Sequence, residues 1–208
     1  MNFLIIIIAL LILSLISSKG KGKITAKSKG IVGENQVKRV LKNLPSEYTI
    51  INDVLIKYKS ITTQIDHIVV CSKGVFVIET KNYSGIIFGD DSSKYWTQKL
   101  NGRSNTFYSP LWQNRTHVNA IRTLLKKYKH ISVYSIVVFC GNSNIKRVKC
   151  KDGVISIKEL SKYIKTYKAE KYLEKEDIKN VSNIINFNNI QGRKARSAYI
   201  KTIKKEHI

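Results

Sequence analysis

The stretch QIDHIVVC at residues 64–71, followed by GVFVIETKNYSG at residues 74–85, decides the fold. Both runs are rich in β-branched residues and predict strands, and SKG at 72–74 predicts a tight turn between them. Each strand carries one acid among apolar residues, Asp66 in the first and Glu79 in the second. Because an isolated ionised carboxylate in apolar surroundings costs several kcal/mol, both acids need a compensating partner.

A lysine lies two residues after the second acid, so Glu79 and Lys81 point to the same face of their strand. If the strand of Asp66 pairs beside them, its carboxylate reaches the same place. Carboxylate oxygens are hard ligands that favour Mg²⁺ or Mn²⁺ over zinc. A lysine beside such an ion can orient or help to deprotonate an attacking water and offset the charge that builds on a phosphorane. The alternative is an exposed strand face with ordinary ion pairs, because Glu-x-Lys alone is a weak signal.

The segments on either side of these strands predict further helices and strands. Apolar residues recurring at i, i+3, i+4 and i+7 from Val37 mark a helix over 30–45 that ends at Pro45. The other predicted elements are strands at 48–56, 62–71 and 75–81 in an antiparallel meander, a hairpin of 95–100 and 103–108, a helix from Ser109 to about 128, a buried strand from 131, and helices at 156–167 and 174–187. This order predicts an α/β (α+β) fold.

Four aromatic side chains occur in the predicted hairpin and at the start of the helix after it. For Tyr95, Trp96, Tyr108 and Trp112 we expect packing within these elements in preference to stacking on bases. The three cysteines have no Cys-x-x-Cys spacing and the four histidines form no ligand box, so neither a disulfide framework nor a zinc site is indicated.

The composition fits one domain with a short anchor and a tail, because the chain has 208 residues of which 43% are apolar. Thirty-seven Lys and Arg against fourteen Asp and Glu give a formal net charge of +23. Such self-repulsion favours a polyanionic partner, either nucleic acid or an anionic lipid surface. A lysine-rich bias of the whole proteome is the alternative explanation.

The N-terminus carries an almost unbroken apolar run, FLIIIIALLILSLI at 3–16, which predicts a transmembrane anchor over 1–18. The basic segment 19–29 then predicts a flexible linker. The positive-inside rule places the folded part in the cytoplasm, as a single-pass protein of the cell membrane, because basic residues follow the run and none precedes it. Export is the alternative. The residues that follow the run are Lys19, Lys21, Lys23, Lys27 and Lys29.

Six motifs taken together resemble the nuclease-related domain (NERD) family of the PD-(D/E)XK nuclease superfamily. They span 30–141 and comprise GENQVKRVL from Gly33, INDV from Ile51, QIDHIVV from Gln64, GVFVIETKNYSG from Gly74, the hairpin of Trp96, and SPLWQNRTH from Ser109. The resemblance implies a restriction-endonuclease-like αβββαβ core with a mixed central sheet. It assigns 30–145 to the nuclease-like domain and leaves 146–208 as a basic, partly helical extension.

The resemblance also implies roles for individual residues. Asp66, Glu79, the main-chain carbonyl of Thr80 and the accessory acid Glu34 would hold Mg²⁺ or Mn²⁺, and Lys81 would be the catalytic lysine. The proline of the superfamily name is absent, since Ile65 precedes Asp66.

Related nucleases carry a glutamine four residues before an aromatic residue on the following helix. Here the pair is Gln113 and His117. Both lie on one stripe of the predicted helix, so they either face the site or are satisfied polar groups at the edge of the core.

These patterns favour a membrane-anchored, metal-dependent nuclease that acts on nucleic acid, with DNA as the expected substrate. A second interpretation is a non-catalytic nucleic-acid or membrane tether that uses the nuclease fold. A third is an envelope interaction protein whose basic end, QGRKARSAYIKTIKKEHI at 191–208, binds anionic lipid.

Overall fold

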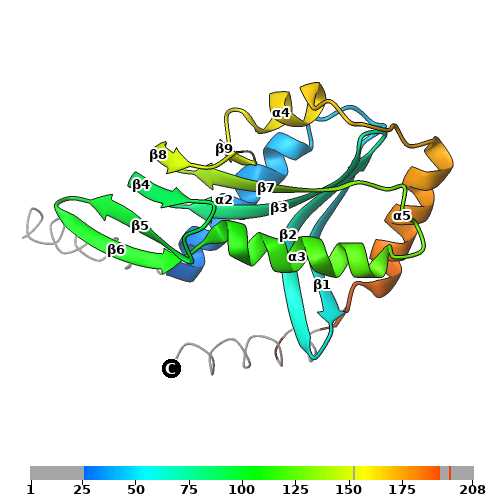
Figure 1. Ribbon diagram of the computed structural model, residues 1–208, viewed down its shortest axis with the longest axis horizontal. Coiled ribbons are helices and arrows are strands. Elements are labelled where there is room, and N and C mark those ends of the chain that lie inside the picture. Colours follow the sequence, from blue (N-terminus) through cyan, green and yellow to red (C-terminus); the bar gives the residue numbers. More distant parts are fainter. Residues whose placement is uncertain (1–25, 152, 193–196, 198–208) are drawn as a thin grey trace, which may run out of the picture.

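The computed structural model describes residues 26–151, 153–192 and 197. In this part of the chain a five-stranded sheet is covered by helices on both faces, and a four-stranded sheet lies beside it (Figure 1). The predicted anchor at 1–18, most of the predicted linker and nearly all of 193–208 lie outside the described residues. None of the described helices is both long enough and apolar enough to span a bilayer.

The central sheet has the strand order β1-β2-β3-β7-β9. Its bounds are β1 Thr49–Tyr58, β2 Ile61–Cys71, β3 Gly74–Asn82, β7 Val133–Cys140 and β9 Val154–Ser156. The first three strands form the predicted antiparallel meander, whereas β7 and β9 join in parallel, so the sheet is mixed as predicted. The strand β9 was not predicted, because three residues of VIS are too short to show a period.

Two helices cover each face of this sheet (Figure 1). The helices α2 (Ala26–Leu41) and α4 (Leu160–Thr166) pack on one face, and α3 (Pro110–Leu124) and α5 (Lys175–Asn188) pack on the other. Helix α2 includes 26–29, which were expected in the linker, and it ends at Leu41, before the predicted end at Pro45. Helix α3 begins as predicted, with Ser109 as N-cap and Pro110 at its first position.

Helix α4 begins later than the helix predicted from 156. The backbone N–H of Ser156 donates to Glu159 Oε2 at 2.9 Å, but Ser156 itself lies in β9 and the helix starts later, with Glu159 at its N-cap and no side-chain capping bond. Helix α5 matches the predicted 174–187 to within one residue at each end.

The second sheet has the order β6-β5-β4-β8, with bounds β4 Gly85–Asp90, β5 Tyr95–Leu100, β6 Arg103–Tyr108 and β8 Ser143–Lys149. The predicted hairpin of β5 and β6 is confirmed. Its turn residues Asn101 and Gly102 have φ of 51° and 73°, the positive values that a two-residue hairpin loop requires. The strands β4 and β8 were not predicted.

The second sheet is held to the first by its inner face. The Trp96 side chain is fully buried and stacks on Phe139 of β7, with ring centroids 6.2 Å apart and an interplanar angle of 5°. This confirms the packing role expected for Trp96. A Cβ added at Gly89 would lie 2.2 Å from the Trp96 ring, so the indole fits only because residue 89 is glycine.

Candidate active site

The candidate site lies where β2 and β3 separate. Hydrogen-bonded pairing between these strands ends at His67 and Ile78, and beyond that point β3 continues with β7 alone. Asp66 fills the opening, because its Oδ2 accepts the backbone N–H of Thr80 at 2.8 Å. The separation of β2 and β3 thus brings the Asp66 carboxylate against the backbone of β3, the strand that carries Glu79 and Lys81.

The neighbouring strand β1 is irregular at the same level. Asp53 has φ of 55°, an uncommon value outside glycine, and the β1–β2 register omits the pair of Asp53 and Asp66 while keeping the same offset on both sides. Ile51 and Val54 consequently face the same core, although strict alternation would put them on opposite faces. The irregularity therefore lies beside the point where β2 and β3 separate, and it brings a second aspartate, Asp53, to that point.

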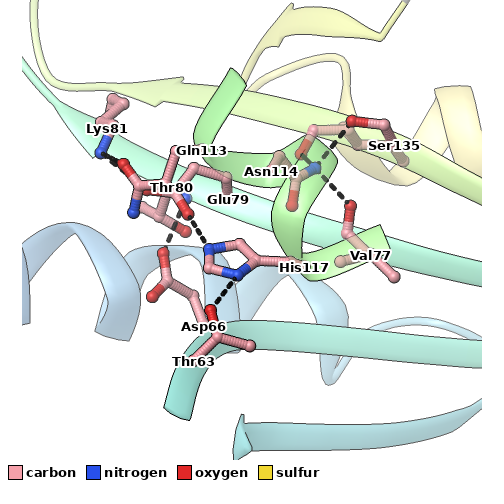
Figure 2. A network of polar contacts seen from close by, with 11 residues as sticks. Thr63, Asp66, Val77, Glu79, Thr80, Lys81, Gln113, Asn114, His117 and Ser135 are labelled. Atoms are coloured by element: carbon pink, nitrogen blue, oxygen red, sulfur yellow. Dashed lines mark hydrogen bonds and ion pairs between the residues drawn. The ribbon is translucent and has the colours of Figure 1, made fainter. Parts of the chain in front are cut away.

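Lys81 is held between two oxygen acceptors. Its Nζ lies 2.6 Å from Glu79 Oε1 and 2.8 Å from the side-chain carbonyl oxygen of Gln113 on α3 (Figure 2). The Glu79 side chain is 3% exposed and that of Lys81 is 18% exposed, so part of the lysine side chain reaches solvent. The predicted common face of Glu79 and Lys81 is confirmed, and Gln113 joins them.

The second oxygen of Glu79 is held by a buried chain of polar groups. His117 Nε2 lies 3.1 Å from Glu79 Oε2, and His117 Nδ1 lies 2.8 Å from Thr63 Oγ1 on β2 (Figure 2). If Nε2 donates its N–H to the carboxylate, Nδ1 is left to accept the Thr63 hydroxyl, so the three groups satisfy one another. The sequence left open whether Gln113 and His117 face the site or lie at the edge of the core. In the structure both residues lie at the site.

A buried amide fixes the helix that carries these groups. Asn114 Nδ2 donates to the carbonyl oxygens of Val77 at 2.9 Å and Ile136 at 3.2 Å, and contacts Ser135 Oγ at 2.8 Å. These acceptors belong to β3 and β7, so the amide fastens the first turns of α3 across both strands (Figure 2). The position of the site side chains on α3 is therefore set by the sheet.

Helix α2 brings Glu34 toward the same place. A Cβ added at Gly33 would lie 2.7 Å from the Cβ of Asn82, so α2 approaches the end of β3 closely because residue 33 is glycine. Asn82 also donates its Nδ2 to the carbonyl oxygen of Lys29 at 2.7 Å. Glu34 is half-buried beside this contact and lies within electrostatic reach of Glu79, Lys81 and Asp66.

The acids raise one another's pKa. Burial raises the pKa of Asp66 well above its ordinary value, the negative charge of Glu79 raises it further, and the Thr80 N–H opposes the shift. Burial also raises the pKa of Glu34, with the charges of Asp53 and Glu79 adding to it. The site thus holds more negative charge than its protein partners compensate, a common feature of functional sites.

The pKa values of Glu79 and Lys81 shift in the directions that favour the charged form of each group. Burial alone would raise the pKa of Glu79, but Lys81 and the His117 hydrogen bond outweigh it and hold this pKa below its ordinary value. Burial alone would lower the pKa of Lys81, but the charge of Glu79 outweighs it and raises this pKa. Both groups are therefore charged at neutral pH.

The donor set fits a hard divalent cation. Asp66, Glu79 and Glu34 supply carboxylate oxygens, and a cation between them would relieve the mutual repulsion that raises the pKa of Asp66 and Glu34. In the described part of the chain, however, no three His, Cys, Asp or Glu side chains converge closely enough to form a ready metal cage. Both oxygens of Glu79 face Lys81 and His117 instead.

Sequence reasoning missed two contributors to the site, Thr63 and Asp53. Thr63 gave no signal beyond its place on a predicted strand, and the sequence left the position of His117 open. Asp53 did give a signal, since it is one of only seven acids in residues 1–145 and lies in the motif INDV. The contribution of the Thr80 carbonyl as a ligand stays a prediction.

Comparison with known proteins supports the family resemblance found in the sequence. Residues 29–140 match the family described as "Nuclease-related domain". The chain belongs to the nuclease-related domain family. This family is part of the PD-(D/E)XK-like nuclease superfamily.

The match spans the site and the elements around it, from the end of the predicted linker to the end of β7. An uncharacterized protein of Bacillus anthracis is 33% identical over 181 residues, which cover 84% of this chain and 84% of the relative. No solved structure matches the chain.

Proposed function

We propose that this member of the nuclease-related domain family hydrolyses phosphodiester bonds of DNA in a reaction that depends on Mg²⁺ or Mn²⁺. One observation carries the proposal: the Lys81 ammonium is fixed between Glu79 and Gln113, on the strand whose backbone binds Asp66. The net charge of +23 supports a polyanionic substrate.

Four groups would hold the metal ion in this proposal: the carboxylates of Asp66, Glu79 and Glu34, and the main-chain carbonyl of Thr80. When bound, the ion polarises the scissile phosphate and lowers the pKa of a bound water. The protein's contribution is to gather acids whose mutual repulsion a bound cation would relieve, which the raised pKa of Asp66 and Glu34 supports.

Lys81 acts in this proposal as a fixed cation. Held by Glu79 and Gln113, its ammonium group orients the attacking water and stabilises negative charge on the phosphate. Gln113 positions the ammonium by accepting one of its hydrogens. His117, itself bonded to Thr63, holds the other oxygen of Glu79. It therefore helps to position Lys81 through the Glu79 carboxylate.

A cleavage assay on the full chain tests the proposal. Labelled DNA and RNA, single- and double-stranded, are incubated with Mg²⁺, Mn²⁺ or EDTA. Cutting should require metal, prefer DNA and fall with Glu79→Ala and Lys81→Ala. Cutting that survives both substitutions would place the reaction elsewhere.

Two substitutions at remote positions supply matched controls. Lys73→Ala removes a lysine from the opposite end of the β2–β3 pair, where its Nζ donates to the Tyr48 hydroxyl at 3.1 Å. Asp177→Asn removes the carboxylate of a second carboxylate–histidine pair, 3.2 Å from His130. Both variants should cut at the wild-type rate. Metal-independent DNA binding without cutting in any condition would favour the non-catalytic tether.

The proposal includes membrane anchoring through residues 1–18, with the folded part in the cytoplasm. It rests on the apolar run at 3–16 and on the lysines that follow it. Protease treatment of spheroplasts should leave the domain intact until the membrane is permeabilised. Release from the membrane on removal of 193–208 alone would favour attachment through the basic end.

A further inference from the structure

The second sheet has an outer face that is not covered by any described helix or strand. Its inner face holds Trp96, Phe107 and Ile87, which pack with Phe139. Residues directly opposite on paired strands share a face, and successive residues alternate. The register therefore puts on the outer face Tyr95, Thr97 and Lys99 of β5, Ser104, Thr106 and Tyr108 of β6, Ile86 and Phe88 of β4, and Arg147 and Lys149 of β8.

Aromatic rings lie at the surface of this face. Tyr95 is 60% exposed and Tyr108 is 42% exposed, in contrast to the packing expected for them from the sequence. They are cross-strand partners whose rings meet edge to face, with centroids 6.1 Å apart. Lys94 Nζ lies 5.7 Å from the centre of the Tyr95 ring, and Lys99 Nζ lies 5.2 Å from that of Phe88. Rings and ammonium groups thus lie close together on this face.

The charge of the second sheet is strongly positive. Its single acid is Asp90, whose carboxylate is already bonded by the backbone N–H and hydroxyl groups of Ser92 and Ser93. The basic residues of the four strands are Lys99, Arg103, Lys146, Arg147 and Lys149. A polyanion is therefore the complementary occupant.

The second sheet is joined to the candidate site at both ends. It leaves β3 directly after Lys81, where Gln98 Nε2 of β5 donates to the carbonyl oxygen of Ser84 at 2.7 Å. It returns to α3 at Ser109, one turn before Gln113. In Figure 1 the hairpin of β5 and β6 projects from the end of the central sheet at which β3 ends. A nucleic-acid strand bound on the hairpin would thus lie beside β3 and α3, which carry candidate site residues.

We infer that the outer face of β4, β5, β6 and β8 binds single-stranded nucleic acid, with bases stacked on Tyr95 and Tyr108 and phosphates paired with Lys99 and Arg147. Single strands expose the base faces that stacking requires, whereas a duplex hides them. The inference rests on the proposed function, because it makes a single strand the form in which substrate is delivered to the site.

Binding of the full chain to labelled single-stranded DNA, measured by fluorescence anisotropy in EDTA, tests the stacking contacts. Tyr95→Ala/Tyr108→Ala should weaken binding at least about tenfold, because stacking contributes about 1–3 kcal/mol per base. Tyr95→Phe/Tyr108→Phe keeps both rings and should bind like the wild type. Tyr172→Ala is the matched control, because it removes a tyrosine that is 59% exposed and lies outside both sheets.

The phosphate contacts are tested by salt dependence. Lys99→Ala/Arg147→Ala should reduce the slope of log affinity against log salt by about 1.4, since each phosphate contact on a single strand contributes about 0.7. Lys171→Ala/Lys175→Ala removes two exposed lysines outside the second sheet and should change the slope less.

Four outcomes would overturn the inference. In the first two, Tyr95→Ala/Tyr108→Ala binds single-stranded DNA with wild-type affinity, or it loses as much affinity for duplex DNA as for single strands. In the other two, the variant still binds DNA but loses dimerisation in sedimentation, or it still binds DNA but loses binding to phosphatidylglycerol vesicles. Failure of the proposed function is distinguishable, because it appears as tyrosine-dependent binding in EDTA with no cutting in Mg²⁺ or Mn²⁺. Cutting in Mg²⁺ without tyrosine-dependent binding would instead remove only the binding face.

Discussion

The two sheets of this protein differ in how many of their faces are covered. The central sheet is packed by helices on both faces, and most residues of its strands β2, β3 and β7 are buried. The second sheet buries one face against Phe139 and leaves the other exposed. A buried polar group in the first sheet costs free energy unless it is paired, whereas a polar or aromatic group on the second can stay at the surface.

This difference separates the residues proposed for the chemical step from those proposed for binding. Where β2 and β3 separate, Glu79 is held by Lys81 and His117, and Asp66 by the Thr80 N–H, so these side chains are held in place before substrate arrives. On the outer face of the second sheet, Tyr95 and Tyr108 keep much of their surface exposed. Fixed charge suits a chemical step, and exposed rings suit contact with a partner.

The largest effect should come from Asp66→Asn, which sharpens the comparison at the covered sheet. We expect cleavage to fall by about 10³-fold or more, because Asp66 is a metal ligand in the proposed reaction and such a ligand contributes several kcal/mol to the transition state. The introduced amide can still accept the Thr80 N–H through its carbonyl oxygen, so the local backbone should keep its position. The measurement is kcat/KM with a labelled DNA substrate.

The same substitution should increase stability in EDTA at neutral pH. The folded-state pKa of Asp66 is raised, so its contribution to stability is present below its ordinary pKa and is lost as the pH rises through the raised value. Asparagine avoids that loss. Denaturant unfolding at pH 5 and pH 8 checks the sign, and a variant less stable than wild type at pH 8 would contradict it.

Trp96→Ala would break the contact between the two sheets and should cost about 3–5 kcal/mol, as large aromatic truncations in a core do. Because Trp96 packs on Phe139 from the second sheet, the loss should be concentrated in β4, β5 and β6. Amide hydrogen exchange should accelerate in those strands more than in β2 and β3. Uniform acceleration over both sheets would show that they unfold as one unit.

Two carboxylate–histidine pairs compare buried and exposed surroundings directly. The Glu79–His117 pair is 3.1 Å apart with side chains 3% and 4% exposed, and the Asp177–His130 pair is 3.2 Å apart with side chains 27% and 39% exposed. His117→Ala should cost about 3 kcal/mol, because it leaves a buried carboxylate with one partner fewer. His130→Ala should cost under about 1 kcal/mol. Equal values in denaturant unfolding would mean that burial does not decide the cost.

The sequence predicted the covered sheet well, because its strands show strong local patterns. The runs around Asp66 and Glu79 are apolar, and the glycine turn between them is short, so pairing of these strands followed directly. The placement of Lys81 beside Glu79 needed only the two-residue period of a strand. Gln113 came from the family resemblance, and its contact with Lys81 could be found only in three dimensions.

The second sheet was predicted only at its hairpin. Asn101 and Gly102 are a strong turn signal, but β4 is six residues with two glycines and β8 is polar, so neither shows a strand period. Pairing of β4 with β8 joins segments far apart in the chain, which no local pattern can indicate. The positive φ of Asp53 was equally invisible, because it accompanies an irregularity in the pairing of β1 with β2 that no local pattern indicates.

The smallest stability effect should come from Tyr95→Ala/Tyr108→Ala on the open face. The two rings are a cross-strand pair, which contributes about 0.2–1 kcal/mol, and both are already exposed. The melting temperature should therefore fall by no more than about 4 °C for a chain of this size. If differential scanning calorimetry finds this small shift while single-strand binding falls about tenfold, the rings serve contact rather than folding. A fall in stability as large as that of Trp96→Ala would instead show that the open face supports the fold, and the contrast between the two sheets would disappear.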